Sequence, residues 1–265
     1  MTVHEIRSIS KVGTTEPFEL QVSRGQIPAH YPQFKFGFNP DVDDSTETVW
    51  AEGGLYYHPL SATQMKVSSS SDDDTANEGN GARTVELFGL DANYDEISEV
   101  VTLDGTSEVT TSKSFLRINR GIVRSAGDNE VATGTIYAGT GTVTLGVPAS
   151  IYLSIKPEDG QTLMAIWTVP AGYTAHLMQT DATVATTQNN KYATVTVLAK
   201  PFGEVFQVKD KFVIAQGNHS QKYNIPLSFA EKTDIEVRCV GDSSGANIAV
   251  SAGLDIVYIK NDSRL

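Results

Sequence analysis

The fold class follows from stretches such as Tyr192-Ala193-Thr194-Val195-Thr196-Val197 and Asp234-Ile235-Glu236-Val237-Arg238-Cys239, in which side chains alternate in character. Alternation with a period of two places one set of side chains on each face of a β-strand. The same unit, a short strand followed by a turn rich in Gly, Asn, Asp or Pro, recurs from residue 17 to residue 260. No run longer than about ten residues has the i, i+3, i+4 apolar spacing of an amphipathic helix. The sequence therefore predicts an all-β protein.

The strand pattern pauses at Lys156-Pro157-Glu158-Asp159-Gly160, which predicts a domain boundary. We expect an N-terminal arm over residues 1–16, a β domain over 17–156 and a β-sandwich over 157–265. Order should begin with an alternating strand at residues 18–22. Both domains are expected to be β-sandwiches or jelly rolls, and the C-terminal half is the clearer jelly roll because its turns delimit seven or eight short strands.

Charge and hydropathy exclude several kinds of partner. The formal net charge is −12 and the isoelectric point is about 4.8, which opposes binding to nucleic acid and to anionic membranes. No window approaches the 18 apolar residues of a membrane span, and the first residues lack the pattern of a signal peptide. We therefore expect synthesis in a cytoplasm. The single cysteine, Cys239, shares a strand face with Ile235 and Val237 and is expected to be a buried small hydrophobe.

No pattern of residues predicts catalysis. The five histidines lack metal-ligand spacing, and neither a Gly-X-Ser-X-Gly motif nor a phosphate-binding loop is present. The acidic residues 41–47 could supply calcium ligands, but they lack the Gly and Glu positions of an EF-hand loop, so a solvated loop is preferred. Residues 72–74 are weaker candidates, because ordering a flexible loop around an ion costs entropy. Residues 68–81 have low complexity and predict a mobile loop outside any core. We expect no catalytic residue, no metal and no cofactor.

An aromatic cluster, Phe34, Phe36 and Phe38, alternates with Lys35 and Gly37. The three rings should therefore share one face of a strand. Two placements are open. The preferred interpretation is a core strand, and the alternative is a surface strip that contacts another protein.

Several strings of residues together resemble structural proteins of tailed bacteriophages, notably phages of cyanobacteria and marine bacteria. The resemblance covers nearly all of residues 17–260. The strings are residues 18–28, Phe36-Gly37-Phe38-Asn39-Pro40, Val49-Trp50, residues 89–94, residues 114–119, residues 166–173 and Glu231-Lys232-Thr233-Asp234-Ile235.

This resemblance implies a virion component, and within that class a cement or decoration protein on the outside of the capsid. Such a protein would bridge neighbouring major capsid proteins, as a homotrimer whose weak contacts add through avidity. One alternative is a tail fibre, adaptor or glycan-binding receptor component, with Trp50, Tyr56, Tyr57 or Trp167 stacking on sugar rings. A second is a phage enzyme that degrades polysaccharide.

Overall fold

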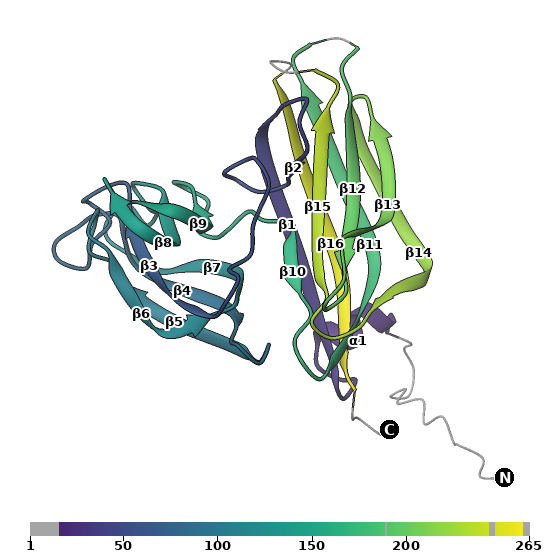
Figure 1. Ribbon diagram of the computed structural model, residues 1–265, viewed down its shortest axis with the longest axis horizontal. Coiled ribbons are helices and arrows are strands. Elements are labelled where there is room, and N and C mark those ends of the chain that lie inside the picture. Colours follow the sequence, from purple (N-terminus) through teal and green to yellow (C-terminus); the bar gives the residue numbers. More distant parts are fainter. Residues whose placement is uncertain (1–15, 189, 244–246, 262–265) are drawn as a thin grey trace.

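The computed structural model describes residues 16–188, 190–243 and 247–261. Within them the chain forms one short helix, α1 (Phe18–Ser23), and otherwise antiparallel strands arranged in two sandwiches of different size. Figure 1 shows the two sandwiches side by side, with α1 at the lower end of the larger one. The all-β prediction is confirmed. The predicted arm, residues 1–16, lies outside the described residues except for Glu16. No helix among the described residues is long and apolar enough to cross a membrane.

The larger sandwich is a jelly roll. One sheet has the order β1-β16-β11-β14, and the other has the order β10-β15-β12-β13, with β2 also paired to β15. From β10 onward the chain passes back and forth between these sheets, except at β12 and β13, which pair with each other in one sheet. Its strands are β1 (His30–Val42), β2 (Glu47–Thr48), β10 (Ile166–Thr168), β11 (Tyr173–Thr186), β12 (Ala193–Lys200), β13 (Gln207–Ile214), β14 (Gly217–Phe229), β15 (Asp234–Gly241) and β16 (Ile248–Lys260).

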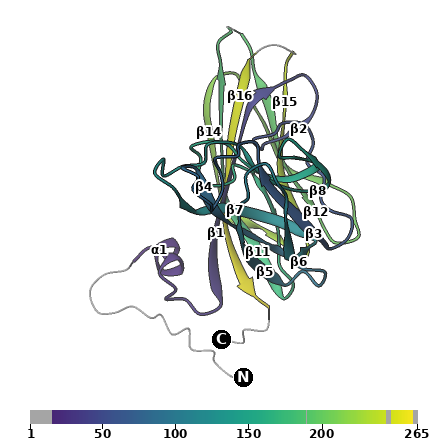
Figure 2. The ribbon, with the colours of Figure 1, turned by 90° about the vertical axis from the view of Figure 1, so that its left-hand side faces the viewer.

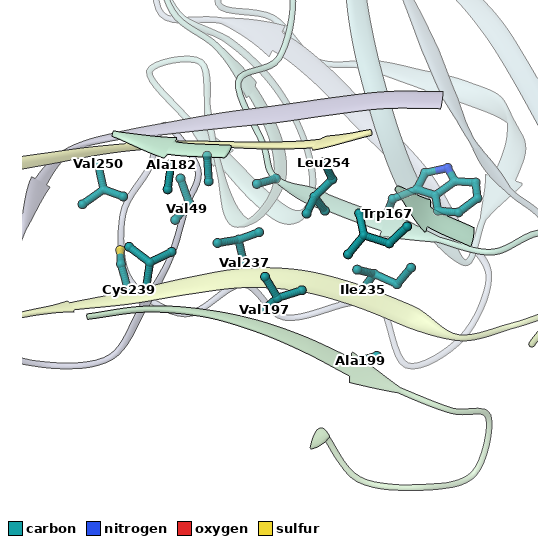
Figure 3. Packing of buried hydrophobic residues seen from close by; sticks show 14 of the residues in the cluster. Val49, Trp167, Ala182, Val197, Ala199, Ile235, Val237, Cys239, Val250 and Leu254 are labelled. Atoms are coloured by element: carbon teal, nitrogen blue, oxygen red, sulfur yellow. The ribbon is translucent and has the colours of Figure 1, made fainter. Parts of the chain in front are cut away.

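The core of the jelly roll lies between these two sheets. Trp167, Val197, Val237 and Leu254 are almost fully buried there, from four different strands (Figure 3). Cys239 is 1% exposed in the same cluster, and burial raises the pKa of its thiol to about 12. The prediction that Cys239 is a buried small hydrophobe is therefore confirmed.

The smaller sandwich is inserted into the larger one, between β2 and β10. Its sheets have the orders β6-β3-β8-β9 and β5-β4-β7. They enclose a separate core that includes Met65, Leu87, Phe115, Ile136 and Leu153. Figure 2 views the molecule from the side of this inserted sandwich. Its strands are β3 (Thr63–Ser69), β4 (Ala82–Leu90), β5 (Glu96–Thr102), β6 (Val109–Phe115), β7 (Arg117–Ala126), β8 (Ile136–Thr144) and β9 (Val147–Ile155).

The predicted division into residues 17–156 and 157–265 does not match this pairing. β1 pairs with β16 along almost its whole length, from His30 opposite Ile259 to Val42 opposite Ile248. β2 pairs with β15, and Val42 and Val49 belong to the jelly-roll core. The pause near residue 157 marks the end of the insertion. Its beginning carries no comparable signal, and antiparallel pairing between distant segments cannot be read from local alternation.

The strand predicted at residues 18–22 is instead the first part of helix α1. Pro17 precedes it with φ −53°, and its carbonyl accepts hydrogen bonds from the backbone N–H groups of Leu20 and Gln21. Val22 is buried, whereas Phe18 and Leu20 are 42% and 45% exposed. Five residues are too few to distinguish a period of two from one of 3.6.

The low-complexity segment 68–81 also differs from its prediction, because it is built around a buried carboxylate. Asp74 is fully buried. It accepts hydrogen bonds from the Ser69 hydroxyl (2.5 Å) and from the backbone N–H groups of Ala82 (2.7 Å), Thr133 (2.8 Å) and Gly134 (2.8 Å). Hydrogen bonds to the Asp74 carboxylate, and not apolar packing, therefore hold this loop in place.

We predict that Asp74→Ala lowers the free energy of unfolding by roughly 3 kcal/mol, because two buried and one partly buried N–H group lose their acceptor. Urea denaturation followed by circular dichroism measures this. Asp72→Ala is the matched control, since that carboxylate is exposed and its hydrogen bonds within the described residues are to Thr106. Equal losses for the two variants would show that burial of Asp74 is unimportant.

Candidate functional site

The aromatic strip, defined as Phe34, Phe36 and Phe38, lies on the outer face of β1. Phe34 is 51% exposed and Phe38 is 37% exposed, while the alternate residues Lys35, Gly37 and Asn39 are buried. The three rings share a face, as the alternation predicts, but the preferred core placement is wrong. The structure exposes the strip, and its role as a protein contact stays a prediction.

The inward positions of β1 explain this orientation. A Cβ atom on Gly37 would lie 2.2 Å from the carbonyl oxygen of Val49 and 2.4 Å from the amide nitrogen of Ala165. Two backbone segments therefore approach β1 at a distance that only glycine permits. The large rings cannot occupy this face, so they point outward.

Further apolar groups lie near the aromatic strip. The rings of Phe34 and Phe36 stack with their centroids 5.5 Å apart, and Phe34 lies over Gly253 of β16. Helix α1 presents Phe18 against His30 at the start of β1, and Glu19 of the helix pairs with Lys222 of β14 at 3.5 Å. The outer face of this sheet thus combines exposed aromatic rings with charged groups, as protein-binding surfaces do.

Reciprocal hydrogen bonds join the other side of β1 to the inserted sandwich. Lys35 donates from its Nζ atom to the carbonyl oxygen of Asn119. In the opposite direction, Arg120 donates to the carbonyl oxygen of Phe34 at 2.8 Å. The Asn119 side chain also accepts from the backbone N–H of Thr168 at 3.2 Å. Adjacent residues of β1 and β7 therefore exchange side-chain contacts across the junction of the two sandwiches.

A buried ion pair reinforces the junction. Arg117 of β7 donates to both oxygens of Asp234 on β15, at 2.7 and 3.0 Å, and the Thr168 hydroxyl donates to the same carboxylate at 2.7 Å. The side chains of Arg117 and Asp234 are 9% and 3% exposed. Burial acts to raise the pKa of Asp234, but His58 and Arg117 outweigh it and the pKa lies below its ordinary value.

His58 and Glu236 extend this polar layer. The Nε2 atom of His58 lies 3.5 Å from Oε1 of Glu236 and 3.8 Å from Oδ1 of Asp234. Arg238 donates to the other oxygen of Glu236 at 2.9 Å, and the His58 ring packs edge-on against Tyr56. Two carboxylates of β15 therefore face Arg117 and His58 from two other parts of the chain, and Arg238 from β15 itself.

Removing one partner of the Arg117–Asp234 pair should be costly. We predict that Arg117→Ala lowers the free energy of unfolding by about 3–5 kcal/mol, because Asp234 would become an uncompensated buried charge. Arg124→Ala on the same strand is the control. Its pair with Glu86 is surface-exposed, so its loss should cost under about 1 kcal/mol. Denaturant titration compares the variants, and equal losses would contradict the buried role of Arg117.

Lys35 has an unusual protonation equilibrium. It is 2% exposed, and burial, followed by repulsion from Arg120, lowers its pKa to about 7 from an ordinary 10.5. Below the folded-state pKa the protein carries the full cost of the buried ammonium. As pH rises from about 7 toward 10.5, the unfolded chain binds more protons than the folded one, so stability increases.

We therefore predict that the free energy of unfolding of the native protein, measured against that of Lys35→Met, rises between about pH 7 and about pH 9. The limiting slope is about 1.4 kcal/mol per pH unit for one proton. Lys66→Met, which removes a more exposed lysine paired with Glu108, should show no such slope. A pH-independent difference between native protein and Lys35→Met would disprove the lowered pKa.

The remaining candidate residues from the sequence are acidic and aromatic side chains. Glu47, from the acidic group 41–47, is buried and accepts hydrogen bonds from Asn39 and from the backbone N–H groups of Asp43 and Gly54. Among the residues that the structure describes, no group of three His, Cys, Asp or Glu side chains could hold a metal ion. Of the aromatic residues weighed for sugar stacking, only Tyr57 is well exposed, at 71%; the others, Trp50, Tyr56 and Trp167, are buried.

Sequence reasoning missed the junction. Arg117 and Asp234 are distant in the sequence, and although each lies in a string that carries the resemblance, nothing in those strings indicates that the two side chains pair. The one local signal was Lys35, a charged residue flanked by Phe34 and Phe36. Alternation indicates that Lys35 lies on the strand face opposite the rings. Because the preferred interpretation places the rings in the core, it places Lys35 on the surface, which is the reverse of the structure.

The chain shows weak structural similarity to viral proteins of known structure. No protein-family model and no curated protein match the chain. The structure of the infectious bursal disease virus Gx strain is 10% identical over 89% of this chain and 73% of that chain, with a TM-score of 0.27. Empty particles of cowpea mosaic virus are 8% identical over 78% of this chain and 86% of that chain, with a TM-score of 0.20. Likeness at this level carries no argument about function.

Proposed function

We propose that this chain is a non-catalytic structural component of a phage virion that binds the outside of the capsid and bridges major capsid proteins. The observation that carries the proposal is the aromatic strip. Two of its three rings are more than a third exposed on one face of the jelly roll. Exposed aromatic rings beside polar groups are typical of protein-binding surfaces. The resemblance of residues 17–260 to phage structural proteins supplies the class of partner.

The charges around the aromatic strip indicate what the partner surface should contain. Asp255 lies opposite Phe34 on β16, and Asp181 of β11 is near enough to contribute to raising the pKa of Asp255, although burial is the larger cause. With a net charge of −12, the chain favours a capsid surface that offers an apolar groove flanked by Lys or Arg. Such a protein would sit on the shell and away from the packaged DNA.

A homotrimer suits this role. Three copies around a three-fold axis of the shell would engage three equivalent capsid sites, and the second and third contacts would form at high effective concentration. A modest strip on each copy is then sufficient for stable attachment. The polar junction between the sandwiches would hold the inserted sandwich in a fixed position relative to the strip.

Gold-labelled antibody against the protein, imaged on purified virions, tests the proposal. Gold over the head supports capsid binding, and capsids stripped of the protein should then burst at a lower temperature. Gold confined to the tail would overturn capsid binding in favour of a tail component. Absence of gold from the virion would overturn the structural role altogether.

The strip itself is tested by substitution. We predict that Phe34→Ser combined with Phe38→Ser weakens co-sedimentation with stripped capsids on the order of tenfold or more, because central aromatic anchors carry most interface energy. Tyr57→Ser removes a more exposed ring that lies outside the strip and should bind as the native protein does. Thermal unfolding checks that both variants fold. Unchanged binding of the double variant would exclude the strip as the contact.

A further inference from the structure

A cavity of about 290 Å³ lies at the junction of the two sandwiches. β1 contributes Lys35 to its wall, and β7 contributes Asn119 and Arg120. Phe88 of β4 supplies aromatic surface, whereas Trp167 of β10 borders the cavity but is only 2% exposed. The cavity is close to the lower end of the size range of small-molecule sites and combines apolar walls with a few convergent polar groups, as such sites do.

The two cations at this cavity lack a negative partner. Among the described residues, neither Lys35 nor Arg120 forms an ion pair within 4 Å, although each donates a hydrogen bond to a carbonyl oxygen. An ammonium carries three donors and a guanidinium five, so donors are left on both groups. Two like charges held together in a protein of net charge −12 produce a local positive potential that an anion would relieve.

The remaining titratable group of the cavity does not supply that anion. Glu96 of β5 lines the wall, but Tyr258 donates to its carboxylate at 3.4 Å and burial raises its pKa. It forms no ion pair with either cation within the described part of the chain. The cavity therefore has two cations, one carboxyl group held by a tyrosine, and no compensating charge beside Lys35.

We propose that this cavity binds a small organic carboxylate, with its carboxylate group between Lys35 and Arg120 and its body against Phe88. Carboxylates form short, charge-assisted hydrogen bonds with ammonium and guanidinium groups. The aromatic ring of Phe88 favours an organic anion over an inorganic one, because it can cover a carbon framework. Since the cavity draws on both sandwiches, the ligand would link them. This site is independent of capsid attachment.

Isothermal titration calorimetry of the full chain tests the site at about pH 6, where Lys35 is charged. The probes are glucuronate and benzoate, and the controls are their neutral counterparts methyl glucoside and benzamide. At least one carboxylate should bind at millimolar concentration, and neither neutral compound should. Lys35→Met and Arg120→Gln should each weaken that binding about tenfold or more, whereas Lys66→Met should bind like the native protein.

Two further readouts distinguish a built site from loose ion pairing. Affinity should fall from about pH 6 to about pH 9 as Lys35 loses its proton, and binding near neutral pH should take up protons, which makes the measured enthalpy depend on the buffer. The proposal is overturned by failure of both carboxylates to bind, by equal binding of the neutral compounds, or by inorganic phosphate binding as tightly as either carboxylate. Unchanged affinity in both cavity variants would overturn it equally.

Discussion

The ion pair between Arg117 and Asp234 is the contact on which the position of the inserted sandwich depends. Both groups are almost fully buried, and the guanidinium engages both carboxylate oxygens. A bidentate pair of this kind adds little net stability over an apolar pair of similar size, but its two parallel bonds fix the relative angle of the strands that carry it. The junction therefore favours one relative orientation of the two sandwiches, because rotating one against the other would leave a buried charge without its partner.

Strand β1 contributes to both the junction and the exposed face. β2 and β10 pair with successive parts of β15, so the insertion leaves and re-enters the jelly roll at one sheet edge, beside β1. That placement directs Lys35 and Gly37 of β1 toward the junction and leaves the aromatic strip for solvent. Force applied to the strip would pass through β1 into the Lys35–Asn119 and Arg120–Phe34 bonds. A binding face and a rigid domain junction are thus opposite sides of one strand.

Local alternation predicted most strands of the jelly roll and the burial of Cys239, because period two survives in any context where one face is covered. Alternation could not show which face of β1 points inward, because Phe34 and Lys35 alternate equally well in either orientation. The close approach of Val49 and Ala165 to Gly37 determines that the face with Lys35 and Gly37 is the inner one. Composition likewise gave a wrong prediction for residues 68–81. The lack of apolar residues indicated a mobile loop, but hydrogen bonds to Asp74 hold this loop in place. The insertion escaped prediction because strand pairing between residues 30–42 and 248–260 is set by the whole fold.

The composition of the junction points to a purpose beyond holding two domains together. Apolar side chains of similar volume in place of Lys35 and Arg120 would avoid the cost of charge burial, and such replacements are often neutral or stabilising. The chain instead keeps an ammonium whose pKa is lowered to about 7 beside a guanidinium of the same sign. Among the described residues, Lys35 and Arg120 each donate one hydrogen bond to a carbonyl oxygen across the junction, a contact that a neutral amide side chain could also make. Hydrogen bonding across the junction therefore does not require two cations here, and their presence beside a cavity agrees with the anion site proposed above.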